Sequence, residues 1–167
     1  MANLKDMLAQ VKTQLLAQNW TGGSNKVFAT GSVLVSRHIP EAALRTMRVP
    51  LALIMPGTIR SDPQYNEEPD LFVVQVIVRV IHNVPGDAVG ENPLMGANRP
   101  DVTKSEGAGI LEVMEEVYNA IGRLNVQDHS NFIIQFRQRG GAGGIHIDAT
   151  TYWVYADLEF EGICTAA

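Results

Sequence analysis

Cysteine, clusters of basic residues and long apolar runs are all scarce in this chain. Cys164 is the single cysteine, so an internal disulfide framework is excluded and the fold depends on its core. The net charge is −5 and the basic residues form no block, which argues against a nucleic-acid-binding surface. The apolar stretch at residues 71–81 is too short for a transmembrane helix and contains Arg79, so we expect no membrane partner.

The sequence also lacks a recognisable signal peptide, an internal repeat and any low-complexity tract beyond the glycines of residues 140–144. Without an apolar core before a cleavage site, we expect a protein that stays in the cytosol or is assembled there. Its 167 residues, 46% hydrophobic and 19% charged, suit a single globular domain over residues 1–167. A domain of this length buries roughly two thirds of its unfolded surface, so it needs no covalent staple.

Residues 71–81, LFVVQVIVRVI, predict a long central strand. Successive side chains of a strand point to opposite faces, and β-branched residues favour a pleated surface. The odd-numbered face carries Gln75 and Arg79 among apolar residues, so we expect it to be half-wet. The even-numbered face is purely apolar and is predicted to lie in the core; its members are Phe72, Val74, Val76, Val78 and Val80.

Two amphipathic helices are predicted from apolar residues at helical spacing, at residues 3–18 and 109–124. Glycines at positions 22 and 23 end the first helix. In the second helix we expect three glutamates to face water: Glu112, Glu115 and Glu116. A short helical turn is predicted at residues 40–47, where a proline is tolerated at the N-terminus.

Further strands are predicted at residues 26–37, 49–55, 131–138 and 145–163. Pro50 confines the second of these to an edge or to its own beginning. The last two strands are predicted to be antiparallel neighbours across the glycine-rich turn. The expected fold is therefore α+β, with a mostly antiparallel sheet, helices packed on one face and long inter-strand loops. The other face would carry polar side chains whose opposite charges pair across strands: Gln75, Arg79, Gln135, Arg137, Asp157, Glu159 and Glu161.

No set of residues in the sequence predicts catalysis, a cofactor site or a metal site. The four histidines lack the spacing of a zinc-protease motif. His146 and Asp148 are two positions apart on a predicted strand and so share one of its faces. They could form an acid–base pair or part of a metal site, or they could be two polar residues on the solvent-exposed face of a hairpin. The stretch RGGAGGIHID lacks the lysine and hydroxyl of a P-loop, and the acids of residues 62–70 lack calcium-loop spacing. We therefore expect no catalytic residue, no cofactor and no metal ligand.

Two connections, residues 56–70 and 82–105, are too long to serve only as links between strands. Both mix apolar and charged residues, as non-obligate interfaces do. Two aromatic residues of the last strand lack basic neighbours, so a subunit interface is a better interpretation than base stacking. The predicted assembly interface consists of Asp62, Tyr65, Glu67, Glu68, Arg79, Leu94, Met95, Arg137, Trp153 and Tyr155.

The order of these elements resembles the tail terminator proteins of long-tailed bacteriophages. The likeness covers residues 4–161 and includes the aromatic–acidic alternation of the closing strand, YWVYADLEFE. The resemblance implies a ring, usually six-fold, that caps the tail tube, stops its polymerisation and provides the docking surface for the head connector. It also implies a place in the tail or neck of the virion, assembled in the host cytoplasm, and no catalytic residues.

The partners implied are other copies of the chain, the tail tube protein and the head connector or stopper protein, without a membrane or sequence-specific nucleic acid. Two alternatives remain open. One is another tail or neck component, such as a tail tube or connector subunit. The other, from a different class of protein, is a small hydrolase or transferase that uses His146 and Asp148.

Overall fold

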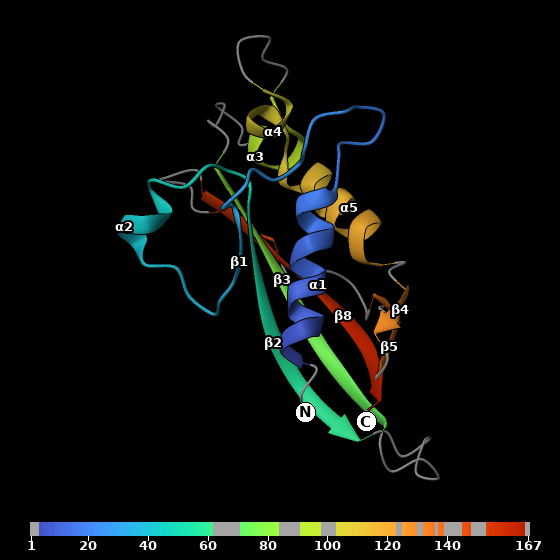
Figure 1. The fold of residues 1–167 in the computed structure, drawn as a ribbon. Coiled ribbons are helices and arrows are strands. Elements are labelled where there is room, and N and C mark those ends of the chain that lie inside the picture. Colours follow the sequence, from blue (N-terminus) through green and yellow to red (C-terminus); the bar gives the residue numbers. More distant parts are fainter. Residues whose placement is uncertain are drawn as a thin grey trace.

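The fold of the computed structural model is α+β, as predicted (Figure 1). The structure describes residues 4–61, 71–83, 91–97, 103–122, 125–129, 132–135, 137–138, 145–147 and 153–165. The helices are α1 (Leu4–Ala17), α2 (Glu41–Leu44), α3 (Asn92–Met95), α4 (Lys104–Gly107) and α5 (Ile110–Ile121). The strands are β1 (Val33–Val35), β2 (Leu51–Ser61), β3 (Leu71–Asn83), β4 (Asn125–His129), β5 (Phe132–Gln135), β6 (Arg137–Gln138), β7 (His146–Ile147) and β8 (Trp153–Thr165).

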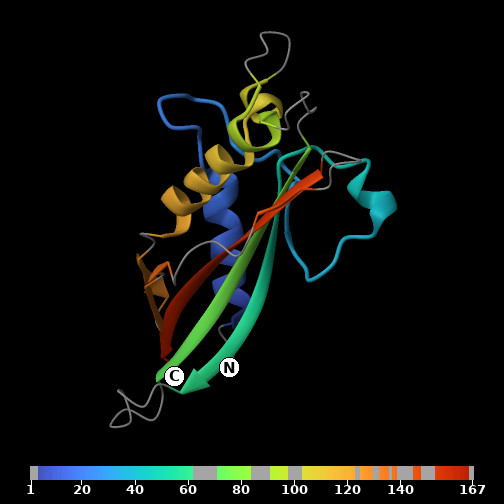
Figure 2. The ribbon, with the colours of Figure 1, turned by 180° about the vertical axis from the view of Figure 1, so that it is seen from behind.

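The main sheet is built around β3, as the sequence predicts. Its order is β1-β2-β3-β8-β6, and β7 also pairs with β8. β3 is antiparallel to β2 on one side and to β8 on the other, whereas β1 and β2 are parallel. Two further strands, β4 and β5, form a separate two-stranded sheet. The three long strands run side by side as one twisted ribbon (Figure 2).

The even-numbered face of β3 lies in the core, which confirms the predicted strand register. Val76, Val78 and Val80 are fully buried and Val74 is 3% exposed, whereas the side chain of Phe72 lies outside the described residues. Even-numbered residues of β8 join the same cluster. The helical members of this cluster come from α1 and α5: Met7, Leu8, Val11, Leu15, Ile110, Val113, Val117 and Ile121. Both helix predictions are confirmed, because their apolar stripes meet this sheet face.

The predicted strand at residues 26–37 is wrong over most of its length, since only β1 is a strand. The chain turns before β1, where the amide of Ser32 donates to the carbonyl of Ala29 (2.9 Å) and Gly31 adopts a φ of +92°. Val27 and Phe28 are nonetheless buried in the core. Their apolar character therefore reflects packing of a non-regular segment and not a strand.

The strand predicted at residues 49–55 begins later and runs further, as β2, to Ser61. Pro50 precedes the strand, as expected, but Pro56 lies inside it. The register against β3 shifts between Pro56 and Ile59, because a proline cannot donate to the ladder and is tolerated at a bulge. At Gly57 an added Cβ would come within 2.6 Å of Gln75 Oε1, so the bulge requires glycine. The predicted connection 56–70 is thus shortened to 62–70.

The predicted strand at residues 145–163 is divided into β7 and β8, which pair with each other. β6 pairs further along the same edge of β8, with Gln138 opposite Phe160 and His146 opposite Tyr155. The last two predicted strands are antiparallel neighbours, as expected, because β6 pairs antiparallel with β8. They are not consecutive in the chain, since β7 lies between them. Residues 139–144 connect two strands that both pair with β8, and they lie outside the described residues. The pairing of β4 with β5 was not predicted.

The connection predicted at residues 82–105 contains secondary structure, namely α3 and the start of α4. Gly96 forms a bridge with Ala108, and the amide of Ala97 donates to the carbonyl of Gly107 (2.7 Å). A Cβ on Gly109 would lie 2.1 Å from the carbonyl oxygen of Leu94. This close approach holds residues 94–97 against the start of α5. Residues 84–90 and 98–102 lie outside the described part.

Candidate functional site

The odd-numbered side chains of β3 and their neighbours on β2 and β8 form the outer face of the sheet. Figure 2 views the sheet from behind, with the long strands crossing in front of α1. Leu51 and Leu53 are buried here, outside the main core cluster, while Ile77 and Ile81 are half-buried. Charged and amide side chains surround them, so this face is half-wet, as the sequence predicts.

Arg79 and Asp157 form a bidentate ion pair on the outer face. They are direct partners in the β3–β8 register. Arg79 Nε lies 2.7 Å from Asp157 Oδ1, and Nη2 lies 2.8 Å from Oδ2. The hydrogen bond to Asp157 raises the pKa of Arg79 further above its ordinary value. Two parallel bonds hold the guanidinium plane in one orientation, and they confirm the predicted pairing of opposite charges.

Gln75 links all three long strands on the outer face. Its Oε1 accepts from Thr58 Oγ1 on β2 (2.8 Å), and its Nε2 donates to Glu159 Oε2 on β8 (3.1 Å). Arg60 on β2 adds an ion pair with Glu161 on β8, with Nη2 3.2 Å from Oε1. These described polar groups therefore have partners within the sheet itself.

Tyr155 is an exposed aromatic residue at one end of this row of side chains, next to Asp157 on the same face of β8. It is 37% exposed. Its ring stacks on His146, with centroids 4.6 Å apart and planes 16° apart. Arg79 Cζ also lies 5.1 Å from the ring centroid, within cation–π range. The fold thus brings together Arg79 and Tyr155, two predicted interface residues, and holds the ring in a fixed place.

The other predicted interface residues do not all join the outer face. Trp153 is half-buried at the start of β8, opposite Asn83. Met95 is 58% exposed on α3, and Leu94 packs against the core. Because α3 contacts α5, these two residues belong to the helical layer. Arg137 pairs with Glu161 in the β6–β8 register, and its side chain is outside the described residues, as are Asp62, Tyr65, Glu67 and Glu68.

His146 is placed for stacking on Tyr155, and Asp148, its possible catalytic partner, lies outside the described residues. Within the part that the structure describes, no group of three or more histidine, cysteine or acidic side chains could hold a metal ion. The pairing of His146 with Asp148 therefore stays a prediction. His146 is exposed and its ring covers one face of Tyr155.

Glu116 is buried, which corrects the prediction that it faces water. It is 5% exposed. Gln18 Nε2 donates to its Oε2 (2.8 Å), and the amide of Thr21 donates to its Oε1 (2.7 Å). Burial alone would raise the pKa of Glu116, but the hydrogen bonds from Thr21 and Gln18 outweigh it and lower the pKa. The carboxylate thus ties the end of α1 to α5. Helical spacing could not reveal this, because both donors lie far away in the sequence.

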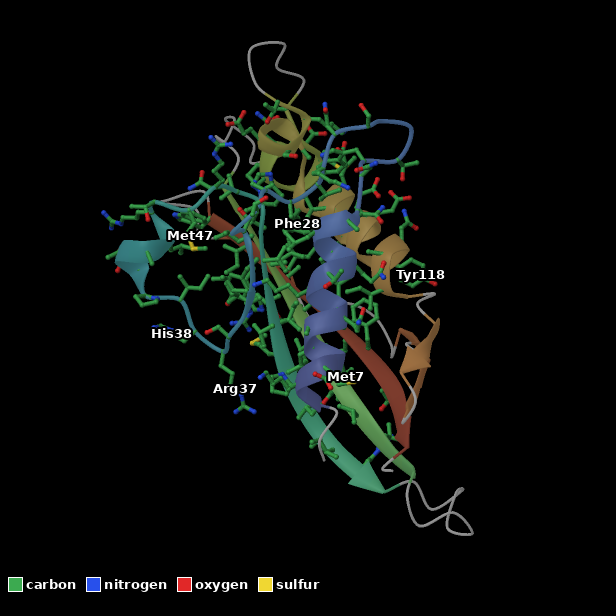
Figure 3. All side chains as sticks on the ribbon, in the orientation of Figure 1. Met7, Phe28, Arg37, His38, Met47 and Tyr118 are labelled. Atoms are coloured by element: carbon green, nitrogen blue, oxygen red, sulfur yellow. The ribbon has the colours of Figure 1, made fainter. Side chains whose placement is uncertain are left out.

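A second feature is a cleft of about 480 Å³ at the end of the sheet where β2 begins. Three separate segments enclose it: residues 25–29, 47–49 and 103–106. Phe28 and Met47 lie in this half of the molecule (Figure 3). The cleft was not predicted, because none of its three segments carries a recognisable motif.

No helix in the described residues combines the length and apolar character needed to cross a bilayer. No protein-family model matches the chain, and no curated protein matches it.

Proposed function

We propose that this protein is a structural component of a phage virion that forms a ring, hexameric in the simplest case, on the end of the tail tube. The ring would stop tube polymerisation and join the tail to the head connector. The proposal starts from the resemblance of the element order and closing strand to tail terminators. Its physical support is the outer face of the sheet.

The outer face has the composition of a subunit interface. An exposed tyrosine and half-buried isoleucines lie among ion pairs that are already formed. Aromatic residues and arginine are enriched in interfaces, and binding costs less when side chains are ordered beforehand. A head-to-tail interface between identical subunits generates a ring when its rotation closes. This face is the single observation on which the proposal depends most.

The experiment is a mass measurement in solution, with and without purified tail tubes, combined with electron microscopy of the tubes. Without tubes, we expect the protein to stay in solution. When it is mixed with tubes, we expect a ring of density at one end of each tube. Tube subunits added afterwards should no longer lengthen that end. Continued growth after mixing, or no density at the tube ends, would contradict the proposal.

The same experiment separates the alternative virion role. A tail tube subunit would polymerise by itself into tubes of varying length, whereas a terminator should not. As a matched pair, Tyr155→Ala removes the exposed ring of the outer face, and Tyr118→Ala removes a tyrosine of α5 that packs against the core. We expect Tyr155→Ala to reduce capping with little change in the melting temperature, and Tyr118→Ala to lower the melting temperature.

A further inference from the structure

The cleft at the start of β2 combines an apolar floor with a cationic rim, and we call it the cationic cleft. Phe28, which is buried, and the half-buried Met47 and Val49 supply apolar surface. Lys26, Arg48 and Lys104 line it, against one carboxylate, Glu106. The cleft is therefore locally positive in a chain whose net charge is −5.

The walls of the cleft are fixed by hydrogen bonds, so the cleft is preformed. Trp20 Nε1 donates to Ser105 Oγ (2.9 Å), which in turn donates to the carbonyl of Val27 (3.1 Å). Ser32 Oγ donates to the carbonyl of Arg48 (2.8 Å). These bonds join the segment after α1, the segment before β2 and α4. The three segments therefore need no rearrangement before a ligand binds.

Arg48 is the cation best placed to receive an anion. Lys26 Nζ donates to the carbonyl of Ala17 (2.6 Å), and Lys104 Nζ is paired with Glu112. The guanidinium of Arg48 donates no hydrogen bond to another described residue. Glu106 accepts hydrogen bonds from Thr103, which lower its pKa, and the charge of Arg48 lowers it further. Within the described residues this fork of donors makes no hydrogen bond to a carboxylate, so it suits the carboxylates of an acidic ligand.

One segment of the chain has the complementary chemistry. Residues 62–70, DPQYNEEPD, contain four carboxylates and no basic residue. Tyr65 lies in their middle and is the single aromatic residue of the segment. Acidic groups suit the cationic rim, and a tyrosine suits an apolar floor with a wet edge.

The segment cannot reach the cleft of its own chain. It joins the end of β2 to the start of β3. The cleft is lined by residues 47–49, just before β2, and the two ends of β2 lie at opposite ends of the long strands (Figure 1). β2 has 11 residues, which at about 3.3 Å per residue span roughly 36 Å. The nine residues of 62–70 must leave and return, so they extend at most about 16 Å from the sheet. A contact between this segment and the cleft would therefore join two molecules.

We propose that the cationic cleft of one copy binds the acidic segment 62–70 of a second copy. Such a contact joins opposite ends of two identical chains, so it is heterologous and can close into a ring. The inference rests on the proposed ring and identifies one of its contacts. Arg48 would pair with the carboxylates of the segment, and Tyr65 would cover Phe28 and Met47.

The first test measures binding of a labelled peptide of residues 62–70 to the full chain, at protein concentrations below self-association. We expect saturable binding that weakens as salt rises, because ions screen exposed charge pairs. Arg48→Glu should weaken it roughly tenfold or more, since it replaces attraction by repulsion. Arg45→Glu is the matched control, because Arg45 follows directly after α2, outside the cleft, with its side chain 73% exposed. Equal binding by the two variants would overturn the inference.

The second test uses charge reversal and measures mass in solution beside the capping of tail tubes. Arg48→Glu should lower the assembled mass, and adding Glu67→Lys and Glu68→Lys should restore it. If the assembled mass is the same for Arg48→Glu and the unchanged chain, the inference fails while capping of tubes still supports the proposed function. If the peptide binds as expected but the protein never caps a tube, the contact between copies stands and the proposed function fails.

Discussion

Arg79 on β3 and Asp157 on β8 lie directly opposite each other and share two hydrogen bonds, of 2.7 and 2.8 Å. Their side chains are 35% and 27% exposed, so water screens the pair only in part. The pair also holds Arg79 against the ring of Tyr155. One cross-strand contact thus orders the part of the outer face on which the proposed assembly depends.

We predict a measurable coupling between these two residues. In a double-mutant cycle of Arg79→Ala and Asp157→Ala, the coupling in the free energy of unfolding should be about 0.5–1 kcal/mol. The cycle is measured by urea denaturation. The matched cycle of Arg60→Ala and Glu161→Ala should give less, because Arg60 is 52% exposed and makes a single bond of 3.2 Å. Equal coupling in both cycles would contradict the bidentate geometry.

Val76→Asp should be strongly destabilising. Val76 is fully buried in the centre of the core face, so the new carboxylate would be buried without a partner. We expect a loss of about 3 kcal/mol or more in the free energy of unfolding. The control is Val35→Asp, at a position that is 45% exposed on β1, which should change stability by well under half as much. Thermal melting checks both, and an unchanged midpoint for Val76→Asp would refute the strand register.

Removing the buried carboxylate of Glu116 should cost more than removing its exposed neighbour. Glu116→Ala leaves the amide of Thr21 and the side chain of Gln18 without their acceptor, at a cost of roughly 2–3 kcal/mol. Glu115→Ala, on the exposed side of α5, should cost a few tenths. Chemical denaturation of the two variants provides the comparison. Equal losses would show that the hydrogen bonds of Glu116 make no net contribution to the free energy of unfolding.

Glu116 also predicts a dependence of stability on pH. The pKa of Glu116 is lower in the folded protein than its ordinary value, so the folded state favours the ionised form. The stability that Glu116 contributes is therefore complete above the ordinary pKa of a glutamate and is lost as pH falls through the lowered folded value. Glu116→Gln should lose less stability on acidification than the unchanged chain.

His82 adds a separate loss of stability in mild acid. His82 is fully buried, with 0% of its surface exposed. Its Nδ1 accepts a hydrogen bond from the amide of Asn83 (3.0 Å). Burial lowers the pKa of His82 from 6.5 to about 4, opposed in part by the backbone of Ala108 and Ser105. The unfolded chain thus binds a proton before the folded chain does. Stability should fall as pH decreases from about 6.5 to 4, by about 3 kcal/mol in total.

Urea denaturation at pH values between 7 and 4 checks this loss. His82→Gln should flatten the pH dependence over that range, because glutamine does not titrate. His146→Gln is the matched control, since His146 is exposed, and its profile should follow that of the unchanged chain. Parallel profiles for both variants would mean that His82 does not carry the effect.

Much of the fold could be predicted because it follows from local periodicity. Alternation in residues 71–81 predicts β3 and the face that is buried, since successive side chains of a strand must point to opposite sides. The apolar spacing in α1 and α5 predicts their buried stripes in the same way. The ion pair of Arg79 and Asp157 follows from two such patterns placed on neighbouring strands.

The boundaries between elements were predicted less well, because they depend on contacts from outside the segment. Val27 and Phe28 look like strand residues, but they are buried in a non-regular segment. Pro56 looks like the end of a strand, yet pairing with β3 carries β2 past it through a bulge. In each case tertiary packing and sheet pairing outweigh local preference.

The sequence by itself determined the fold class, the central strand and the character of its two faces, because side-chain direction along a helix or strand repeats with a fixed period. Only the tertiary structure decided that Glu116 is buried beneath Gln18 and Thr21, that β6 and β7 share one edge of β8, and that three distant segments enclose the cationic cleft. These features join residues separated by tens of positions. No local pattern encodes such a contact, since it exists only once the chain has packed into a single core.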